Sequence, residues 1–266
     1  NLPGTTNEYV DNTVSVGVSY EYKVICTASG FTGYGYINSG IEIPLIENRG
    51  SILLLIDNTF ESSLATEITR LVNDLEGDGW GVIKEYVSRT ATVPSVKDII
   101  RTKYNFANPA LKAVFLLGHV PVPYSGIIYP DGHTNHQGAW PADVYYADMT
   151  ADWTDTYVNI TTASDSRNWN VPGDGKFDRW EIPKSLELQV GRVDFYNMPA
   201  FSKTETQLLK DYLDKNHNYR HKIFSINQKA LIDDNFGYFS GEAFAANGFK
   251  NFSPLVGSSN VIEGDY

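Results

Sequence analysis

The segment NVPGDGKFDRWE, residues 170–181, carries oxygen-bearing side chains at the spacing of an EF-hand-type calcium loop. Counted from its first residue, they stand at the first, fifth, ninth and twelfth positions, and Gly175 holds the sixth, where such a loop turns sharply. Pro172 occupies a place where a further oxygen ligand is expected, so a Gly-Asp turn with solvated carboxylates is the alternative. The predicted calcium ligands are Asn170, Asp174, Asp178 and Glu181.

A second acidic segment, DVYYADMTADWTD, precedes this loop. Carboxylates that crowd together without a cation repel one another, so one interpretation is a second cation site. An acidic surface loop is the interpretation that the sequence favours. The carboxylates in question are those of Asp143, Asp148, Asp152 and Asp155.

Three histidines lie near these segments. His133 and His136 are three residues apart with Asp131 nearby, a set that can hold zinc, although histidines that order a loop by hydrogen bonding are the simpler interpretation. His119 follows the apolar run in KAVFLLGHVPVP, residues 112–123. A residue at the carboxyl end of a strand can bind substrate or an ion, whereas hydrogen bonding to the carbonyls of the loop is the structural alternative.

No complete catalytic set can be assembled from the sequence. It contains neither a Gly-x-Ser-x-Gly nucleophile elbow nor a glycine-rich phosphate loop after its first buried strand. The single cysteine, Cys26, lies in an alternating strand pattern and is expected to be a small buried hydrophobe.

Composition limits the classes of partner. The 266 residues carry a net charge of −11, which disfavours nucleic-acid binding, and no apolar run is long enough for a membrane span. One cysteine excludes an intrachain disulfide. Abundant tyrosine and phenylalanine with sparse lysine are typical of secreted or cell-surface proteins.

The elements that would position these residues fall into two regions. Residues 1–47 are predicted to be all-β, with strands in NEYVDNTV, VGVSYEYKVICTAS and GYINSGIEIP. From Ser51 to Leu117 strands and helices alternate, which predicts a parallel sheet with helices on its faces. Residues 120–184 are predicted to form a long functional or ligand-binding loop.

The alternating pattern resumes after this loop. SLELQVGRVDF predicts a strand, and Ser202 with Glu205 forms a capping box at the start of a helix. KALIDD predicts another strand and GEAFAANG a short helix ending at Gly248, with no closing element in the final segment, IEGDY.

The first region resembles the last three strands of a fibronectin type III sandwich, with Tyr20 placed as the tyrosine corner. On this resemblance, residues 1–47 are the C-terminal strands of such a module. The sequence then begins inside a domain of a longer, multidomain protein.

The region from residue 48 to residue 266 resembles the N-terminal part of a gingipain-family cysteine peptidase domain, which has a caspase-like α/β fold. The similar segments are SILLLID with its helix and GWGVIKEYV, then KAVFLLGHVPVP, DVYYADM, LQVGRVDF with its helix, and KALIDDN. Family catalysis uses a His-Gly and an Ala-Cys after two later strands, and neither is present before Tyr266. The family usually has Gly-Asp where this chain has Gly118-His119.

The resemblance implies a secreted or surface cysteine endopeptidase whose His/Cys dyad is expected beyond Tyr266. Its loops would be stabilised by calcium, its partners would be peptide or protein substrates, and neighbouring domains would complete the chain. The alternative is a peptidase-like scaffold or adhesion module without a working dyad.

Overall fold

The chain forms two compact units, Asn1–Lys210 and Asp211–Tyr266, and each is described by itself. The second unit begins within the helix that follows the main sheet. The structure, a computed structural model, describes residues 2–6, 8–43, 48–129, 132–182, 185–233 and 242–264.

The N-terminal region is a two-stranded antiparallel hairpin, β1 (Tyr20–Ala28) and β2 (Phe31–Ser39), and Gly30 takes a φ of 77° at its turn. The hydroxyl of Tyr20 accepts a hydrogen bond from the amide of Ser15 at 2.9 Å. Residues 8–14, expected to form a strand, do not form one. Cys26, expected to be buried, is exposed, because both faces of the hairpin lie open over most of its length.

A parallel four-stranded sheet forms the centre of the first unit, in the order β4-β3-β5-β8. Every residue of β3 is buried, as its continuous apolar run predicts for a strand covered on both faces. The predicted α/β architecture with a parallel sheet is therefore confirmed. The four strands are β3 (Ser51–Asp57), β4 (Gly81–Val87), β5 (Leu111–Leu117) and β8 (Gln189–Val193).

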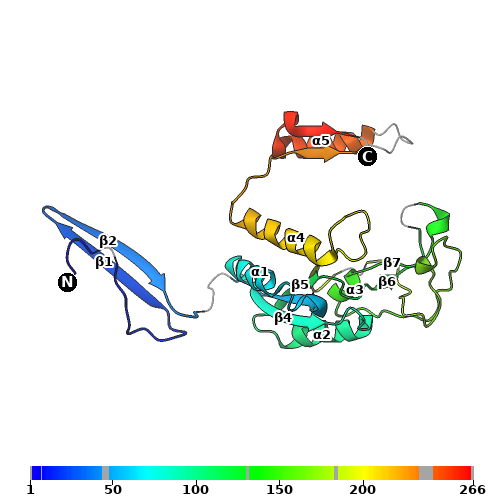
Figure 1. Ribbon diagram of the computed structural model, residues 1–266, viewed down its shortest axis with the longest axis horizontal. Coiled ribbons are helices and arrows are strands. Elements are labelled where there is room, and N and C mark those ends of the chain that lie inside the picture. The colour runs from blue at the N-terminus through cyan, green and yellow to red at the C-terminus, as the bar shows by residue number, and fades with distance from the viewer. Residues whose placement is uncertain are drawn as a thin grey trace. The chain divides into compact units, whose positions relative to one another are not determined.

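Helices cover both faces of this sheet. α1 (Ala65–Gly77) buries a stripe formed by Ile68, Leu71 and Leu75. α2 (Val93–Phe106) packs against the opposite face, where it shares a core with Leu53 and Leu55 of β3 (Figure 1). The connection from β3 to β4 and the connection from β4 to β5 run in opposite directions across the sheet, and right-handed crossovers in opposite directions place their helices on opposite faces.

The long segment after β5 is ordered by short elements and buried aromatic rings. Tyr145 stacks on Phe177 with 4.3 Å between ring centroids, and Trp153 meets both rings edge-on. Lys97 of α2 is fully buried and donates to the carbonyls of Tyr145 and Asp148, and burial lowers its pKa to about 8. The short elements are β6 (Tyr124–Ser125), β7 (Trp140–Pro141) and α3 (Val144–Ala147).

The next helix, α4 (Glu205–Arg220), starts with a capping box two residues later than the predicted one. The amide of Thr204 donates to the side chain of Gln207, whose own amide donates to the Thr204 hydroxyl. Glu205 is therefore free of a capping role, and its carboxylate accepts from Arg89 instead.

The second unit contains a parallel strand pair, β9 (Ala230–Ile232) and β10 (Val261–Glu263), joined through α5 (Glu242–Val256). Two expectations were wrong here. α5 continues past Gly248 to Val256, and Val261–Glu263 is a closing strand that the sequence pattern did not indicate. No helix among the described residues is long and apolar enough to cross a membrane.

Candidate functional site at the carboxyl edge of the sheet

The strand order creates a topological switch point between β3 and β5. From β3 the chain goes outward to β4 and then crosses back to β5 on the other side. Open α/β sheets bind ligands outside the carboxyl ends of their strands at such a point. The residues there are Asp57 at the end of β3, Arg89 after β4, His119 after β5 and Asp194 after β8.

His119 is held in one orientation at this edge. Its Nδ1 lies 2.8 Å from Oδ2 of Asp194, and its ring stacks on Tyr196 with 3.9 Å between centroids. Gly118, with a φ of 82°, precedes it, and a Cβ there would lie 2.6 Å from the Phe60 ring. The sharp turn at glycine thus lifts the histidine out of the sheet, and 28% of its side chain is exposed.

Arg89 connects three element ends beside the histidine. Its guanidinium donates to the buried carboxylate of Asp57 at 2.6 Å and to Glu205 at 3.2 Å. Burial alone would lower the pKa of Arg89, but the hydrogen bonds to these two carboxylates outweigh burial and raise the pKa. Asp57 also accepts from the amide of His119 at 3.2 Å, which ties the turn after β5 to the end of β3.

Arg192 of β8 holds the start of the long segment. It forms a bidentate pair with Asp143, with both N–O distances at 2.8 Å, and donates to the carbonyls of Val120 and Pro121. Bidentate arginine–carboxylate pairs fix geometry as well as charge. The Val-Gly-Arg strand therefore anchors the chain that leaves His119.

The cluster can bind and orient a ligand, and it can move a proton at one atom. A carboxylate on Nδ1 fixes the tautomer of a histidine and leaves Nε2 to meet a ligand. Within the described residues no hydroxyl or thiol bonds Nε2 of His119. The pair of His119 and Asp194 therefore has the orientation of a general base but no nucleophile beside it.

The predicted calcium loop is held together by hydrogen bonds within the protein. The buried carboxylate of Asp178 accepts from the amides of Thr156, Tyr157 and Val158. Burial alone would raise its pKa, but these hydrogen bonds outweigh burial and lower it. Asp174 accepts from two amides and lies 3.5 Å from the ammonium group of Lys176.

The other two predicted ligands do not complete an ion site. Asn170 donates from Nδ2 to the carbonyls of Gly126 and Phe177, whereas its buried Oδ1 has no partner among the described residues. Glu181 is exposed and lines a pocket. With carboxylates already occupied by amides and a lysine inside the loop, these residues do not fit an EF-hand-type site as they are arranged here, and calcium binding is a matter for experiment.

The four carboxylates of the second acidic segment have separate partners or face solvent. Asp143 pairs with Arg192, and Asp148 is buried and accepts from two amides and the indole of Trp153. Asp155 accepts from the amides of Gly173 and Gly175, both at 2.7 Å, and Asp152 is exposed. Among the described residues, no three of the four acidic groups come close enough to share an ion.

His133 and His136 lie apart from the carboxyl edge, in a 3-10 turn at the tip of the long segment. Their ring centroids are 5.4 Å apart and tilted, and the carbonyl of His136 accepts from the indole of Trp140 at 3.0 Å. Asp131, the expected third member of the set, lies outside the described residues.

The sequence placed His119 at this edge but not its partners. Asp57, Arg89, Asp194 and Tyr196 were not predicted as site residues. The sequence did contain a sign of two of them. Asp57 ends one apolar strand and Asp194 directly follows another, and the carboxyl ends of parallel strands lie at one edge of a sheet.

Comparisons with models of known families, with curated proteins and with solved structures found no match.

Proposed function

We propose that this chain is the amino-terminal part of a gingipain-like cysteine endopeptidase of caspase-like fold, secreted or on the cell surface. In this proposal the first unit carries the non-catalytic sheet. The second unit opens the catalytic sheet, and the histidine and cysteine of the dyad lie on strands after β10.

The parallel pair of the second unit carries this proposal. β9 and β10, connected through α5, form a parallel pair within the second unit. A chain with two parallel sheets in succession suits the resemblance, in which KALIDDN opens the catalytic half. The order β4-β3-β5-β8 with helices on both faces suits a caspase-like first half.

The carboxyl-edge cluster would then contact the peptide without cleaving it. His119 presents Nε2 beside an ordered long segment, and the stack on Tyr196 fixes the direction of its hydrogen bond. The hairpin supports a fibronectin type III-like module in front, because the bond between Tyr20 and Ser15 is of the kind that a tyrosine corner makes.

The test measures cleavage of denatured casein by the intact natural protein that contains this chain. The exposed Cys26 is first replaced, in a Cys26→Ser variant, so that it cannot react. We expect this variant to cleave casein and to lose that activity on treatment with iodoacetamide, because a thiolate is the nucleophile.

Two results would decide against a cysteine peptidase. Absence of cleavage together with absence of any alkylated thiol in the Cys26→Ser protein supports the peptidase-like scaffold instead. Cleavage that survives iodoacetamide would show that another nucleophile is used.

A further inference from the structure

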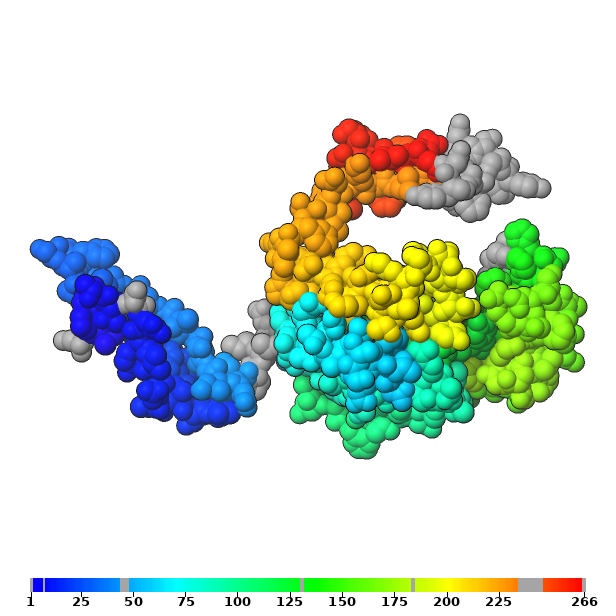
Figure 2. Space-filling model, in the orientation of Figure 1, coloured from blue at the N-terminus to red at the C-terminus, as the bar shows by residue number. Residues whose placement is uncertain are grey.

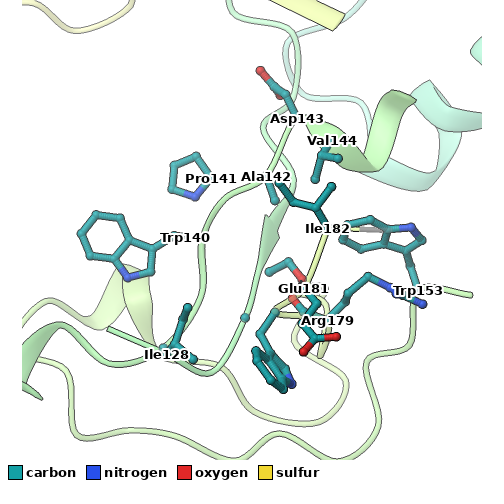
Figure 3. A pocket seen from close by; sticks show the side chains of 14 residues that line it. Ile128, Trp140, Pro141, Ala142, Asp143, Val144, Trp153, Arg179, Glu181 and Ile182 are labelled. Atoms are coloured by element: carbon teal, nitrogen blue, oxygen red, sulfur yellow. Dashed lines mark hydrogen bonds between the residues drawn. The ribbon is translucent and has the colours of Figure 1, made fainter. Parts of the chain in front are cut away.

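A pocket of about 360 Å³ lies in the long segment. Figure 3 shows Trp140 and Trp153 on opposite sides of it, with Arg179 and Glu181 between them. The long segment that forms it appears in green in the space-filling view (Figure 2). Its walls are mainly apolar, and ligand pockets of this kind carry a few polar groups that fix orientation.

The indole rings of this pocket differ in how they are held. Trp153 donates to Asp148, and the Arg179 guanidinium covers its ring at 5.6 Å. Trp140 donates to the carbonyl of His136. Trp180, in contrast, is 50% exposed, and its indole nitrogen has no hydrogen-bond partner among the described residues. Trp180 is therefore the ring with a free face.

The polar groups are concentrated beside Trp180. A smaller cavity of about 220 Å³ shares Arg179, Trp180 and Glu181 with the first and adds Asp152 and Thr154. The Arg179 side chain lines both cavities: its Nη2 donates to the carbonyl of Asp152 at 3.0 Å, and its Nε is buried with no partner among the described residues. The carboxylate of Glu181 likewise forms no hydrogen bond or ion pair with the described part of the chain. The apolar wall of the pocket, the Arg179 guanidinium and the Glu181 carboxylate thus meet at the indole ring of Trp180.

We propose that this double pocket binds a neutral oligosaccharide. A sugar ring offers an apolar C–H face, which can pack on the free face of Trp180. Its hydroxyls can donate to Glu181 and accept from Arg179 at the same time. A strongly anionic ligand would meet Glu181 and Asp152, and a strongly cationic ligand would meet Arg179, so a neutral polyhydroxyl ligand suits the mixed charges best.

The backbone on the β6–β7 side of the pocket disfavours an extended peptide. Peptides that add to a sheet need unpaired main-chain groups. Here the amide of Gly126 donates to Phe177, that of Gly138 to Ile128, and that of Ala142 to the carbonyl of Pro123. These three amides are therefore not available to a peptide strand, and a ligand on this side would be bound through side chains, as a sugar can be.

The experiment is calorimetric titration of the 266-residue chain with cellotetraose, chitotetraose, maltotetraose and mannotetraose. We expect saturable binding of at least one of them. Its affinity should change less than about twofold between about 50 and about 500 mM salt, because a neutral ligand is not screened. Trp180→Ala and Glu181→Gln should each weaken binding about tenfold or more, since they remove the stacking ring and a charged acceptor.

Trp169→Ala is the matched control. Trp169 is 41% exposed, lies outside the pocket and donates to the carbonyl of Ala163, so its loss should leave sugar affinity unchanged. Binding of none of the four sugars, or equal binding by wild type and both pocket variants, overturns the proposal. So does tight binding of an unstructured casein peptide that Trp180→Ala abolishes. None of these results depends on peptidase activity, so this proposal and the proposed function can fail separately.

Discussion

At the scale of single residues, Asp178 combines a place in the calcium-like spacing with hydrogen bonds to the backbone. Its carboxylate lies at the ninth position of the calcium-like loop, but it accepts three backbone amides from residues 156–158. Those amides belong to a part of the long segment that forms no helix or strand, so they have no partner in secondary structure. Backbone amides need a hydrogen-bond acceptor where they are shielded from water. The aspartate therefore replaces secondary structure as the partner of this backbone.

We predict that Asp178→Ala lowers the free energy of unfolding by about 2 kcal/mol, because one buried and two partly buried amide donors lose a charged acceptor. The lowered pKa of Asp178 means that its contribution is present above about pH 4 and is lost as the pH falls through the folded-state pKa. Urea unfolding at pH 7 and pH 3 measures both effects, and the difference between wild type and variant should shrink at the lower pH.

Calcium is tested with the same variant. Since amides occupy the carboxylate, we expect the melting temperature of the wild type to be the same with excess calcium and with a chelator. A calcium-dependent rise that Asp174→Ala and Asp178→Ala both abolish would restore the calcium prediction. Asp165→Ala serves as a control, because Asp165 lies outside the loop and is partly exposed.

At the scale of elements, Arg89 joins the ends of separate secondary-structure elements although it lies in a loop. It follows β4, and its guanidinium contacts Asp57 at the end of β3 and Glu205 at the start of α4. The Asp57 side chain is fully buried, and Arg89 is the cation that pairs with it. Removing one member of a buried ion pair is strongly destabilising.

We predict that Arg89→Ala costs about 3 kcal/mol of unfolding free energy and that Asp57→Asn in the same chain restores part of the loss. Arg101→Ala is the matched control, because its pair with Asp98 is exposed and long at 3.7 Å, and it should change stability by less than about 0.5 kcal/mol. Chemical denaturation measures all three variants. Equal stability of Arg89→Ala and wild type would contradict the role of the pair.

The sequence predicted most elements of the first unit because their signals are local. The alternation of strands and helices from Ser51 to Leu117 depends on patterns among neighbouring residues, such as the apolar run of β3, and it was confirmed. The capping box was misplaced because Ser202 and Thr204 both have a hydroxyl that can cap a helix. In the structure Thr204 pairs with Gln207, while Glu205, the expected partner of Ser202, bonds Arg89. The strand at Val261–Glu263 is three residues long, too short to show a period.

The candidate site was less predictable than the elements that carry it. The hydrogen bond between His119 and Asp194 joins residues 75 positions apart, and it exists because β8 lies next to β5. A sequence pattern shows that strands are parallel but not which strands are neighbours. For the same reason the aromatic pocket could not be assembled from spacing, because its lining comes from the stretches 125–128, 138–144 and 179–182 and from Trp153.

At the scale of the whole molecule, the hairpin and the four-stranded sheet differ in burial. Residues of β1 and β2 are exposed or half-buried along their full length, whereas β3 is buried throughout. A two-stranded hairpin alone is only marginally stable in water, and stability against local opening follows buried apolar contacts.

We predict that amides of β1 and β2 exchange with deuterium at least about a hundredfold faster than those of β3 and β5. Hydrogen exchange followed by mass spectrometry on the intact chain resolves the two regions. Equal protection of hairpin and sheet would show that a further partner covers the hairpin in solution. β4, which also forms a parallel ladder but lies at the sheet edge, is the internal comparison and should be intermediate.

The exposed thiol of Cys26 has a practical consequence. It is the single cysteine of the sequence and stands on β1, in the hairpin and not in the sheet that carries the carboxyl-edge cluster. One maleimide dye would therefore attach at one known position without any substitution. A fluorophore there would report the tumbling of the hairpin against that of the tryptophans in the α/β region, and so reveal whether the two move together in solution.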